Sequence, residues 1–190
     1  MSKAVMLSIR PKWVEKIANG KKTIEVRKTK PRLDTPFKCY IYCTQPKYPH
    51  EDFISTDYPK PQFYGGGKVI GEFTCDRIYE LAPLNHAPDD VEKQACLTRE
   101  EIVNYLKGTG YGWHISDLLV YDEPRDLGEF WQDCLEYSEL STNCWSCENV
   151  CGDGDETDCN TDGRLYLHRP PQSWYYVEAM DGERKDGGDG

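Results

Sequence analysis

The sequence lacks any long apolar run. No segment approaches the roughly 18 consecutive apolar residues of a membrane-spanning helix, so we expect no membrane partner. The first residues, MSKAVMLSIRP, also lack the apolar stretch of a secretory signal, and we therefore expect a cytoplasmic protein. There is no internal repeat, which argues against a repeat architecture.

Positive charge is scarce overall but is concentrated at one end of the chain. There are 23 Lys and Arg residues against 33 Asp and Glu residues, and the net charge of −10 ordinarily argues against nucleic-acid binding. Residues 1–47 nevertheless carry a net charge of +9, whereas residues 48–190 carry −19. This asymmetry indicates either a local anion-binding site in the N-terminal third or simple neutralisation of opposite charges across the fold.

Short segments of alternating apolar and polar residues dominate the sequence. They predict one strand directly after Gly20 and further strands over residues 4–10, 37–44, 68–78, 112–124 and 173–178. Helices are expected from Pro11 to Gly20, over 97–108 with Thr98 and Glu101 as a capping box, and over 126–137 with Asp126 as the cap.

This pattern predicts an α+β fold. We expect a small β-barrel of mixed or antiparallel strands with two or three flanking helices. The chain has 190 residues, a length that suits one domain. We assign residues 1–178 to that domain, with a cysteine-rich insert over 132–168, and residues 179–190 to a disordered tail.

The stretch NGKKTIEVRK (19–28) places several charges close together at the start of a strand. On an extended strand, Glu25 and Arg27 share one face while Ile24 and Val26 take the other. We expect the apolar pair to point into the barrel and the charged pair to face solvent or a cleft.

Two further cations are expected beside this pair. Lys22 lies at the turn after Gly20, and Arg10 leaves the first strand. Together the group offers a guanidinium fork for phosphate or carboxylate, a point charge and an acid/base carboxylate. The alternative is a surface salt bridge worth under about 1 kcal/mol, and spacing alone leaves both interpretations open.

Gly20, Lys22, Glu25 and Arg27 fit the pattern G-x-K-x-x-E-x-R, and on these residues the chain resembles the ASCH family, a branch of the PUA-like barrel superfamily. The segments SIRPKW, KVIGEFTCD, GWHISDLLVYDEP and RPPQSWYYVE are also similar, in particular to ASCH proteins of bacteriophages and mobile elements. The resemblance covers roughly residues 4–131 and 168–178 and implies a PUA-like barrel.

The resemblance also implies a role in binding RNA or a modified nucleotide. Some relatives are acetylcytidine amidohydrolases, and ribonuclease activity has been attributed to others. In the amidohydrolases, the lysine that matches Lys22 works with a threonine at the position of Glu25. A carboxylate cannot act as the hydroxyl nucleophile does, so the resemblance does not extend to acetylcytidine hydrolysis, although Glu25 keeps the chemistry of a general base.

Two residues at the start of the strand predicted over 112–124 are further candidates. His114 can act as an acid or base near neutral pH or can contact a nucleobase, although a lone histidine is more often structural. The candidate catalytic residues are Lys22, Glu25 and His114. The candidate ligand-binding residues are Arg10, Gly20, Lys22, Glu25, Arg27 and Trp113.

The segment 45–67 has no periodicity and is predicted as a long loop. It carries five aromatic residues interleaved with proline, which are Tyr48, Phe53, Tyr58, Phe63 and Tyr64. Their rings either stack on unpaired bases or pin the loop to the barrel, and we expect the second role for most of them.

The cysteines fall into two groups. Cys144, Cys147, Cys151 and Cys159 follow C-x2-C-x3-C-x7-C in an insert poor in aliphatic residues, which predicts a structural zinc site, with Cys134 and His168 as competing ligands. Free thiols or a reversible disulfide, and an iron–sulfur cluster, are the alternatives. Cys39, Cys43, Cys75 and Cys96 lie in apolar stretches and are expected to be small core residues.

Three functions fit this sequence. The first is a module that binds single-stranded RNA or one nucleotide through Lys22, Glu25 and Arg27, and we take it as the working prediction. The second is a hydrolase in which Lys22 polarises the target and Glu25 or His114 moves protons. The third is a phage-encoded protein-interaction module. The acidic remainder of the chain disfavours long duplexes, so the ligand should be small or single-stranded.

Overall fold

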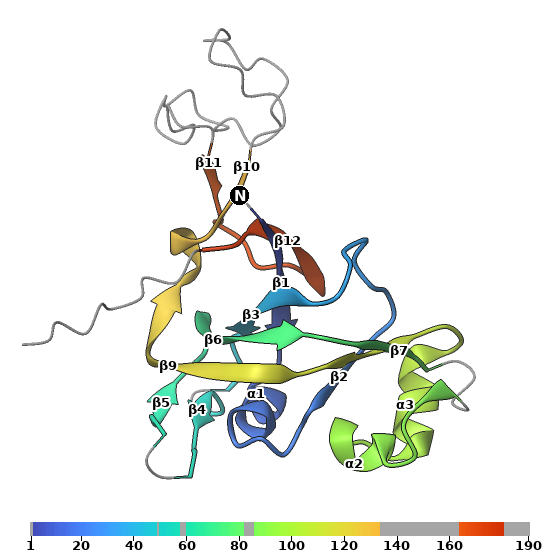
Figure 1. Cartoon of the computed structure of the whole chain (residues 1–190). Coiled ribbons are helices and arrows are strands. Elements are labelled where there is room, and N and C mark those ends of the chain that lie inside the picture. The colour runs from blue at the N-terminus through green and yellow to red at the C-terminus, as the bar shows by residue number, and fades with distance from the viewer. Residues whose placement is uncertain (1, 49, 58–59, 82–85, 134–163, 181–190) are drawn as a thin grey trace, which may run out of the picture.

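A five-stranded mixed sheet forms the centre of the molecule (Figure 1). The computed structural model describes residues 2–48, 50–57, 60–81, 86–133 and 164–180. In spatial order the strands of this sheet are β12 (Trp174–Glu178), β1 (Lys3–Ile9), β3 (Phe37–Cys43), β6 (Lys68–Cys75) and β9 (Ser116–Asp126). β1 and β3 are parallel, and the other neighbours are antiparallel.

The parallel pair requires a crossover connection. This crossover contains α1 (Pro11–Ala18) and β2 (Ile24–Arg27). Pro11 suits the first turn of α1, because that turn has no intrahelical partner for a backbone N–H, and Gly20 turns the chain at a φ of 70°. The strand–helix–strand unit that carries the charged motif is therefore confirmed.

β2 belongs to a second, antiparallel sheet. That sheet has the order β2, β8 (Tyr111–His114) and β7 (Ile78–Glu80). Two short ribbons complete the strands, namely β4 (Phe53–Ile54) with β5 (Phe63–Tyr64), and β10 (Trp131–Asp133) with β11 (Arg164–Tyr166). The α+β class predicted from the sequence is confirmed.

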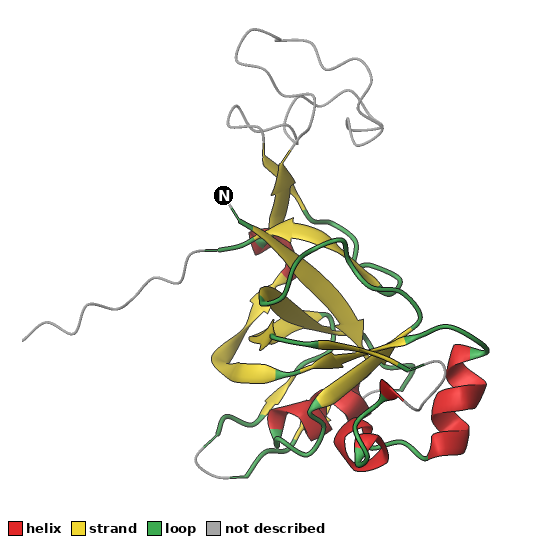
Figure 2. Cartoon of the chain, turned by 45° about the vertical axis from the view of Figure 1, so that its right-hand side comes forward, coloured by secondary structure: helices red, strands yellow, loops and turns green. Residues whose placement is uncertain are grey.

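The helices cover one end of the molecule. α1 lies there with α2 (Val91–Ala95) and α3 (Arg99–Leu106), and the β10–β11 ribbon stands at the opposite end (Figures 1 and 2). The predicted capping box of α3 is confirmed: Thr98 Oγ1 accepts from the Glu101 N–H at 3.2 Å, and Glu101 Oε2 accepts from the Thr98 N–H at 2.8 Å.

The apolar residues of β1 explain why it lies at the centre. Val5 and Leu7 enter the core between the sheet and α1, and Ala4 and Met6 enter a second core on the other face of the sheet. A third core packs Ile24 and Val26 of β2 against α2 and α3. We expected this pair to point into the barrel, and that expectation is wrong because the two helices cover that face of β2.

Two predicted elements differ from the structure. Residues 112–124 form parts of two strands, because β8 pairs with β2 and β7 whereas β9 pairs with β6. The predicted helix over 126–137 is wrong in its described part. Its capping box forms, but one 3-10 turn, η2 (Leu127–Glu129), is followed by β10, in which Trp131 pairs with Tyr166 of β11.

Most of the cysteine-rich insert, with Cys134, Cys144, Cys147, Cys151 and Cys159, lies outside the described residues, as do residues 181–190. The zinc site therefore stays a prediction. Cys39, Cys43 and Cys75 are buried as expected, whereas Cys96 is only partly buried at the end of α2. None of the helices that the structure describes has the length and apolar character needed to cross a membrane.

Candidate functional site

A cleft of about 710 Å³ opens beside β2. Its walls come from segments far apart in the sequence: the end of β1 and the start of α1, β2, the end of β3, α3 and the segment before β12. Its charged lining residues are Arg10, Lys12, Lys22, Glu25, Arg27 and Glu101. Its aromatic lining residues are Trp13, Tyr42 and Tyr105. Cations outnumber anions, so the cleft favours an anionic ligand.

Lys22 is almost completely buried at the edge of this cleft, with 2% of its surface exposed. Its ammonium donates to the backbone oxygens of Ile24 and Ala95, each at 2.8 Å. Lys22 Nζ also lies 3.4 Å from Glu25 Oε2. Burial lowers the pKa of Lys22, and the Glu25 carboxylate offsets part of that effect. The three N–H groups of the ammonium therefore all face oxygen atoms of the protein.

Glu25 is held between two cations. Its Oε1 lies 3.0 Å from Arg27 Nη2, and its Oε2 lies near Lys22 Nζ. Only 7% of Glu25 is exposed. This geometry excludes the surface salt bridge considered from the sequence. Each carboxylate oxygen has two lone pairs, so the contacts with the two cations leave acceptor capacity for a ligand.

Arg27 connects β2 to the two neighbouring segments. Its Nη2 donates to the Ser8 backbone oxygen at 2.8 Å, and its Nη1 donates to the backbone oxygen and Oγ of Ser173, both at 3.2 Å. Arg27 Nε is buried and has no hydrogen-bond partner among the described residues. A buried donor without a partner costs free energy.

Trp13 brings further positive charge to the cleft. The ammonium groups of Lys12, Lys16 and Lys22 lie 4.4, 5.0 and 5.3 Å from the centroid of the Trp13 ring. Such cation–π contacts hold the ring in place, and Trp13 lines the cleft. An ordered aromatic ring surrounded by cations is a suitable surface for a planar anionic ligand.

The structure brings four predicted residues together and leaves three outside. Arg10, Lys22, Glu25 and Arg27 all line the cleft. Gly20 does not line it, and its role is the turn after α1. Trp113 and His114 are also absent from the lining.

The pairing of β2 with β8 explains the positions of Trp113 and His114. Trp113 is opposite Glu25 and therefore on the same face, but it is fully buried and packs edge-on against Phe37. His114 is opposite Ile24, on the other face, where its Nδ1 lies 2.6 Å from Asp76 Oδ1. The geometry thus offers no support for His114 as an acid or base in this cleft.

Several lining residues were not predicted from the sequence. The position of Trp13, at the start of a helix that follows the first strand, is compatible with a place in the cleft. The same helical spacing, however, equally fits a core residue. Tyr105 and Gln172 carry no such signal, because only the packing of α3 and of the segment before β12 brings them to the cleft. Leu97 and Pro171 enter the lining in the same way.

The chain resembles known proteins in its sequence and in its fold. The sequence matches the ASCH domain family over residues 7–152. The solved structure of ASCH from Zymomonas mobilis is similar with a TM-score of 0.53 at 17% identity, and the match covers 92% of this chain and 87% of that one. A serine-to-alanine mutant of that protein gives 0.53 at 16% identity, covering 92% and 88%. No curated protein matches the chain.

At these identities the structural likeness shows the fold alone. The family match, however, extends over more than half of the chain. The chain therefore belongs to the ASCH domain family, as its G-x-K-x-x-E-x-R motif predicts.

Proposed function

We propose that the cleft binds one nucleotide unit of RNA, free or within a single-stranded segment, and holds it without cleaving it. The observation that carries this proposal is the buried cluster of Lys22, Glu25 and Arg27 at the edge of a cleft of about 710 Å³. A volume of this size lies within the range of small-molecule sites, roughly 300–1,000 Å³.

The chemistry of the lining fits the parts of a nucleotide. Arg10 and Lys12 are exposed cations that suit a phosphate, since neither has to leave a buried partner to reach it. The Glu25 carboxylate suits the N–H groups on the edge of a base. Trp13 and Tyr105 supply aromatic surface on which a base can stack.

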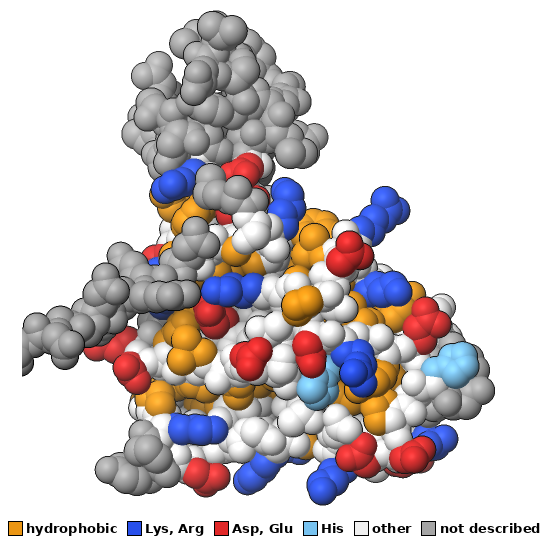
Figure 3. Space-filling view, viewed as in Figure 1, with side chains coloured by type: hydrophobic (Ala, Val, Ile, Leu, Met, Phe, Trp, Pro, Cys, Tyr) orange, Lys and Arg blue, Asp and Glu red, His pale blue; other side chains and the backbone are white. Residues whose placement is uncertain are grey.

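A single-stranded or small ligand is also consistent with the one face of the molecule that Figure 3 shows. Figure 3 shows basic and acidic side chains interspersed over the face in view, without a continuous basic surface for a long duplex. The PUA-like family to which ASCH domains belong is associated with RNA binding, which supports the same class of ligand.

Binding is favoured over catalysis because the ionic groups of the cluster are already engaged. Protonation of Glu25 would leave two buried cations without a counter-charge, which makes proton uptake by this carboxylate costly. Lys22 likewise has to break a contact with Ile24, Ala95 or Glu25 before it can donate to a ligand.

A hydrolase is the second candidate, and one observation favours it. Burial lowers the pKa of Lys22 beside a carboxylate at a cleft, which is an arrangement common among catalytic amines. In that case Lys22 and Glu25 would move protons during hydrolysis of a nucleoside or of single-stranded RNA.

Mass spectrometry separates the two candidates. The wild type is incubated with a nucleotide digest of total tRNA and with a short single-stranded RNA, and bound and released species are identified. The test variant is Arg10→Gln with Lys12→Gln, two exposed positions that leave the buried cluster intact. The matched control is Lys3→Gln with Lys38→Gln, which removes two lysines outside the cleft.

We expect an intact nucleotide to be retained by the wild type and the control but not by the test variant. A new product that forms with the wild type and not with Glu25→Gln would make the protein a hydrolase. Equal retention by test and control variants would contradict binding in this cleft.

A further inference from the structure

Three aromatic rings are exposed in the described part of residues 45–67, two of them on the β4–β5 ribbon and one, Tyr48, before it. Tyr48 is 57% exposed, Phe53 41% and Tyr64 57%. Phe53 and Tyr64 are cross-strand partners with ring centroids 5.2 Å apart, and His50 lies 5.9 Å from Tyr64. The ribbon therefore presents a fixed group of rings to solvent.

The ribbon is held in place by groups other than these exposed rings. At its base, Ile54 is fully buried, and Thr56 Oγ1 donates to the Pro61 backbone oxygen at 2.7 Å. Across β4 and β5, the Gly65 N–H donates to the Asp52 backbone oxygen at 2.9 Å.

The C-terminus of α1 ties the ribbon down as well. Asn19 Nδ2 donates to the Ser55 backbone oxygen at 2.8 Å, and Asn19 Oδ1 accepts from the Asp57 N–H at 3.0 Å. Lys60 Nζ donates to the Ala18 backbone oxygen at 2.6 Å. We expected most of the rings in this segment to pin it to the barrel. For Tyr48, Phe53 and Tyr64 that expectation is wrong, because all three are exposed, whereas Phe63 packs against the main core as expected and Tyr58 lies outside the described residues.

The segment 45–67, which contains the ribbon, starts and ends at the rim of the cleft. Gln45 at its start and Gly67 at its end both line the cleft. Tyr48 and Tyr64 are each three residues away, a separation of at most about 10 Å of extended chain. A polymer that enters the cleft thus has the exposed rings within reach of its neighbouring units.

We propose that the exposed rings of the β4–β5 ribbon stack on the bases of single-stranded RNA that flank the nucleotide held in the cleft. This inference rests on the proposed function and extends it from one nucleotide to a strand. Aromatic side chains bind successive unpaired bases without sequence preference, since every base has a π-face.

The net charge of residues 45–67 indicates which kind of contact they can make with RNA. Lys47 and Lys60 are outnumbered by Glu51, Asp52 and Asp57, so residues 45–67 have a net charge of −1. Stacking, not phosphate pairing, must then supply the contact. The contribution of the ribbon should accordingly depend little on salt, in contrast to that of the cations in the cleft.

The test compares two probes on the full chain. One is a mixture of the four 5′-ribonucleoside monophosphates, and the other is an unstructured 12-nucleotide single-stranded RNA. The variant is Phe53→Leu with Tyr64→Leu, which keeps apolar bulk and removes the stacking faces. Tyr166→Leu, on the other two-stranded ribbon, is the matched control because Tyr166 also pairs with an aromatic residue, Trp131. Tyr48→Leu is a second variant outside both strands.

We expect the ribbon variants to bind the 12-mer about tenfold more weakly at both low and high salt, as loss of base stacking predicts. Their affinity for the monophosphates should equal that of the wild type and of Tyr166→Leu.

Other outcomes overturn the proposal in distinguishable ways. Unchanged 12-mer affinity, with monophosphates still bound, rejects the ribbon and keeps the cleft. Failure of the wild type to bind either probe rejects the proposed function as well. A concentration-dependent dimer in sedimentation that disappears in Phe53→Leu with Tyr64→Leu would assign the rings to self-association instead.

Discussion

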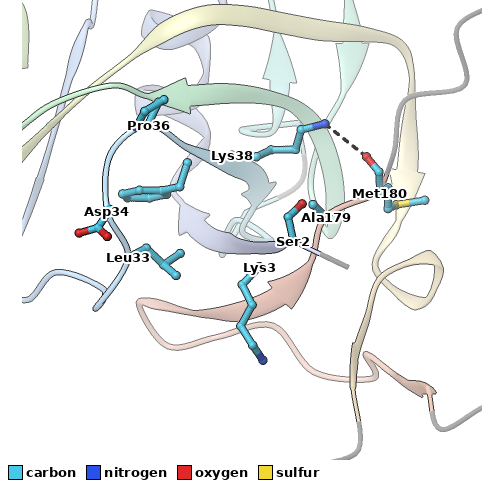
Figure 4. Close-up of a pocket in the computed structure, with 9 residues that line it drawn as sticks. Ser2, Lys3, Leu33, Asp34, Pro36, Lys38, Ala179 and Met180 are labelled. Carbon is cyan, nitrogen blue, oxygen red and sulfur yellow. Dashed lines mark hydrogen bonds between the residues drawn. The ribbon is translucent and has the colours of Figure 1, made fainter.

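Two hollows in this protein are each lined by a lysine that pairs with a glutamate, and the pairs differ in burial. Beside β2, Lys22 and Glu25 are almost fully buried at the cleft of about 710 Å³. In the smaller hollow of about 320 Å³, the Lys38 ammonium donates to the Met180 backbone oxygen at 3.3 Å (Figure 4). Lys38 Nζ also lies 2.9 Å from Oε1 of Glu72, which does not itself line this hollow. The side chains of Lys38 and Glu72 are 31% and 21% exposed.

The difference shows which hollow is a candidate site. A partly solvated pair such as Lys38 and Glu72 costs little desolvation and needs no explanation beyond the local surface. Buried charges are costly to maintain unless each is paired, and a cluster of two cations and one carboxylate is seldom kept for stability alone. The cleft beside β2 is therefore the hollow in which we propose that the charges serve a ligand.

The largest effect should come from removing the central carboxylate. We expect Glu25→Ala to lower the free energy of unfolding by about 3–5 kcal/mol, because it leaves the buried Lys22 and Arg27 without a counter-charge. Glu72→Ala should cost about 1 kcal/mol or less. Urea denaturation followed by circular dichroism measures both. Equal losses would remove the distinction between the two hollows.

The next effect concerns the shape of the cation. Arg27→Lys should weaken nucleotide binding by roughly tenfold, because the guanidinium contacts Glu25 and Ser8 through Nη2 and Ser173 through Nη1, and the single nitrogen of an ammonium does not reproduce that fork. Titration calorimetry with the ribonucleotide mixture gives the affinities. Lys38→Met, in the smaller hollow, should bind like the wild type, and a comparable loss in that variant would refute the assignment.

A smaller effect should appear in the pH dependence of stability. Because the pKa of Lys22 is lowered in the folded state, the unfolded chain binds more protons between that value and the ordinary value of 10.5. The free-energy cost of burying the charged Lys22 ammonium is thus fully present below the lowered pKa, and it is relieved as the pH rises toward 10.5. The stability of the wild type relative to Lys22→Met should increase over this range, by at most about 1.4 kcal/mol per pH unit. A flat difference in urea titrations from pH 7 to 10 would argue against the burial of the charge.

The smallest effect concerns thiol reactivity. Burial raises the pKa of the Cys43 and Cys75 thiols to about 12, so both should stay protonated and react slowly with iodoacetamide at pH 8. The partly buried Cys96, at the end of α2 near the cleft, should be alkylated first among the described cysteines. Peptide mapping at timed intervals checks the order, and early labelling of Cys43 would contradict it.

The sequence predicts best where local signals agree with tertiary pairing. Pro11, Gly20 and the alternation in β1 identify the strand–helix–strand unit, and the spacing of Lys22, Glu25 and Arg27 places those residues at one site. No local sequence pattern predicts the residues that close the cleft from α3 and from the segment before β12.

Prediction fails where a long-range partner decides the structure. The capping signal at Asp126 is real, yet Trp131 leaves the helical path because Tyr166 of β11 pairs with it. Strand parity alone does not place Trp113 either. The residue shares a face with Glu25 but is covered by Phe37 and Trp174, which lie far away in the sequence.

The most direct test of the central claim is a nuclear magnetic resonance titration of the tryptophan indole N–H signals with the four 5′-ribonucleoside monophosphates. Trp13 lines the cleft, whereas Trp131 lies in β10 at the opposite end of the molecule. Trp13→Phe and Trp131→Phe assign the two signals. If nucleotides bind in the cleft, the Trp13 signal should shift saturably while the Trp131 signal stays unmoved. An unmoved Trp13 signal, or equal shifts of both, would contradict nucleotide binding at Lys22, Glu25 and Arg27.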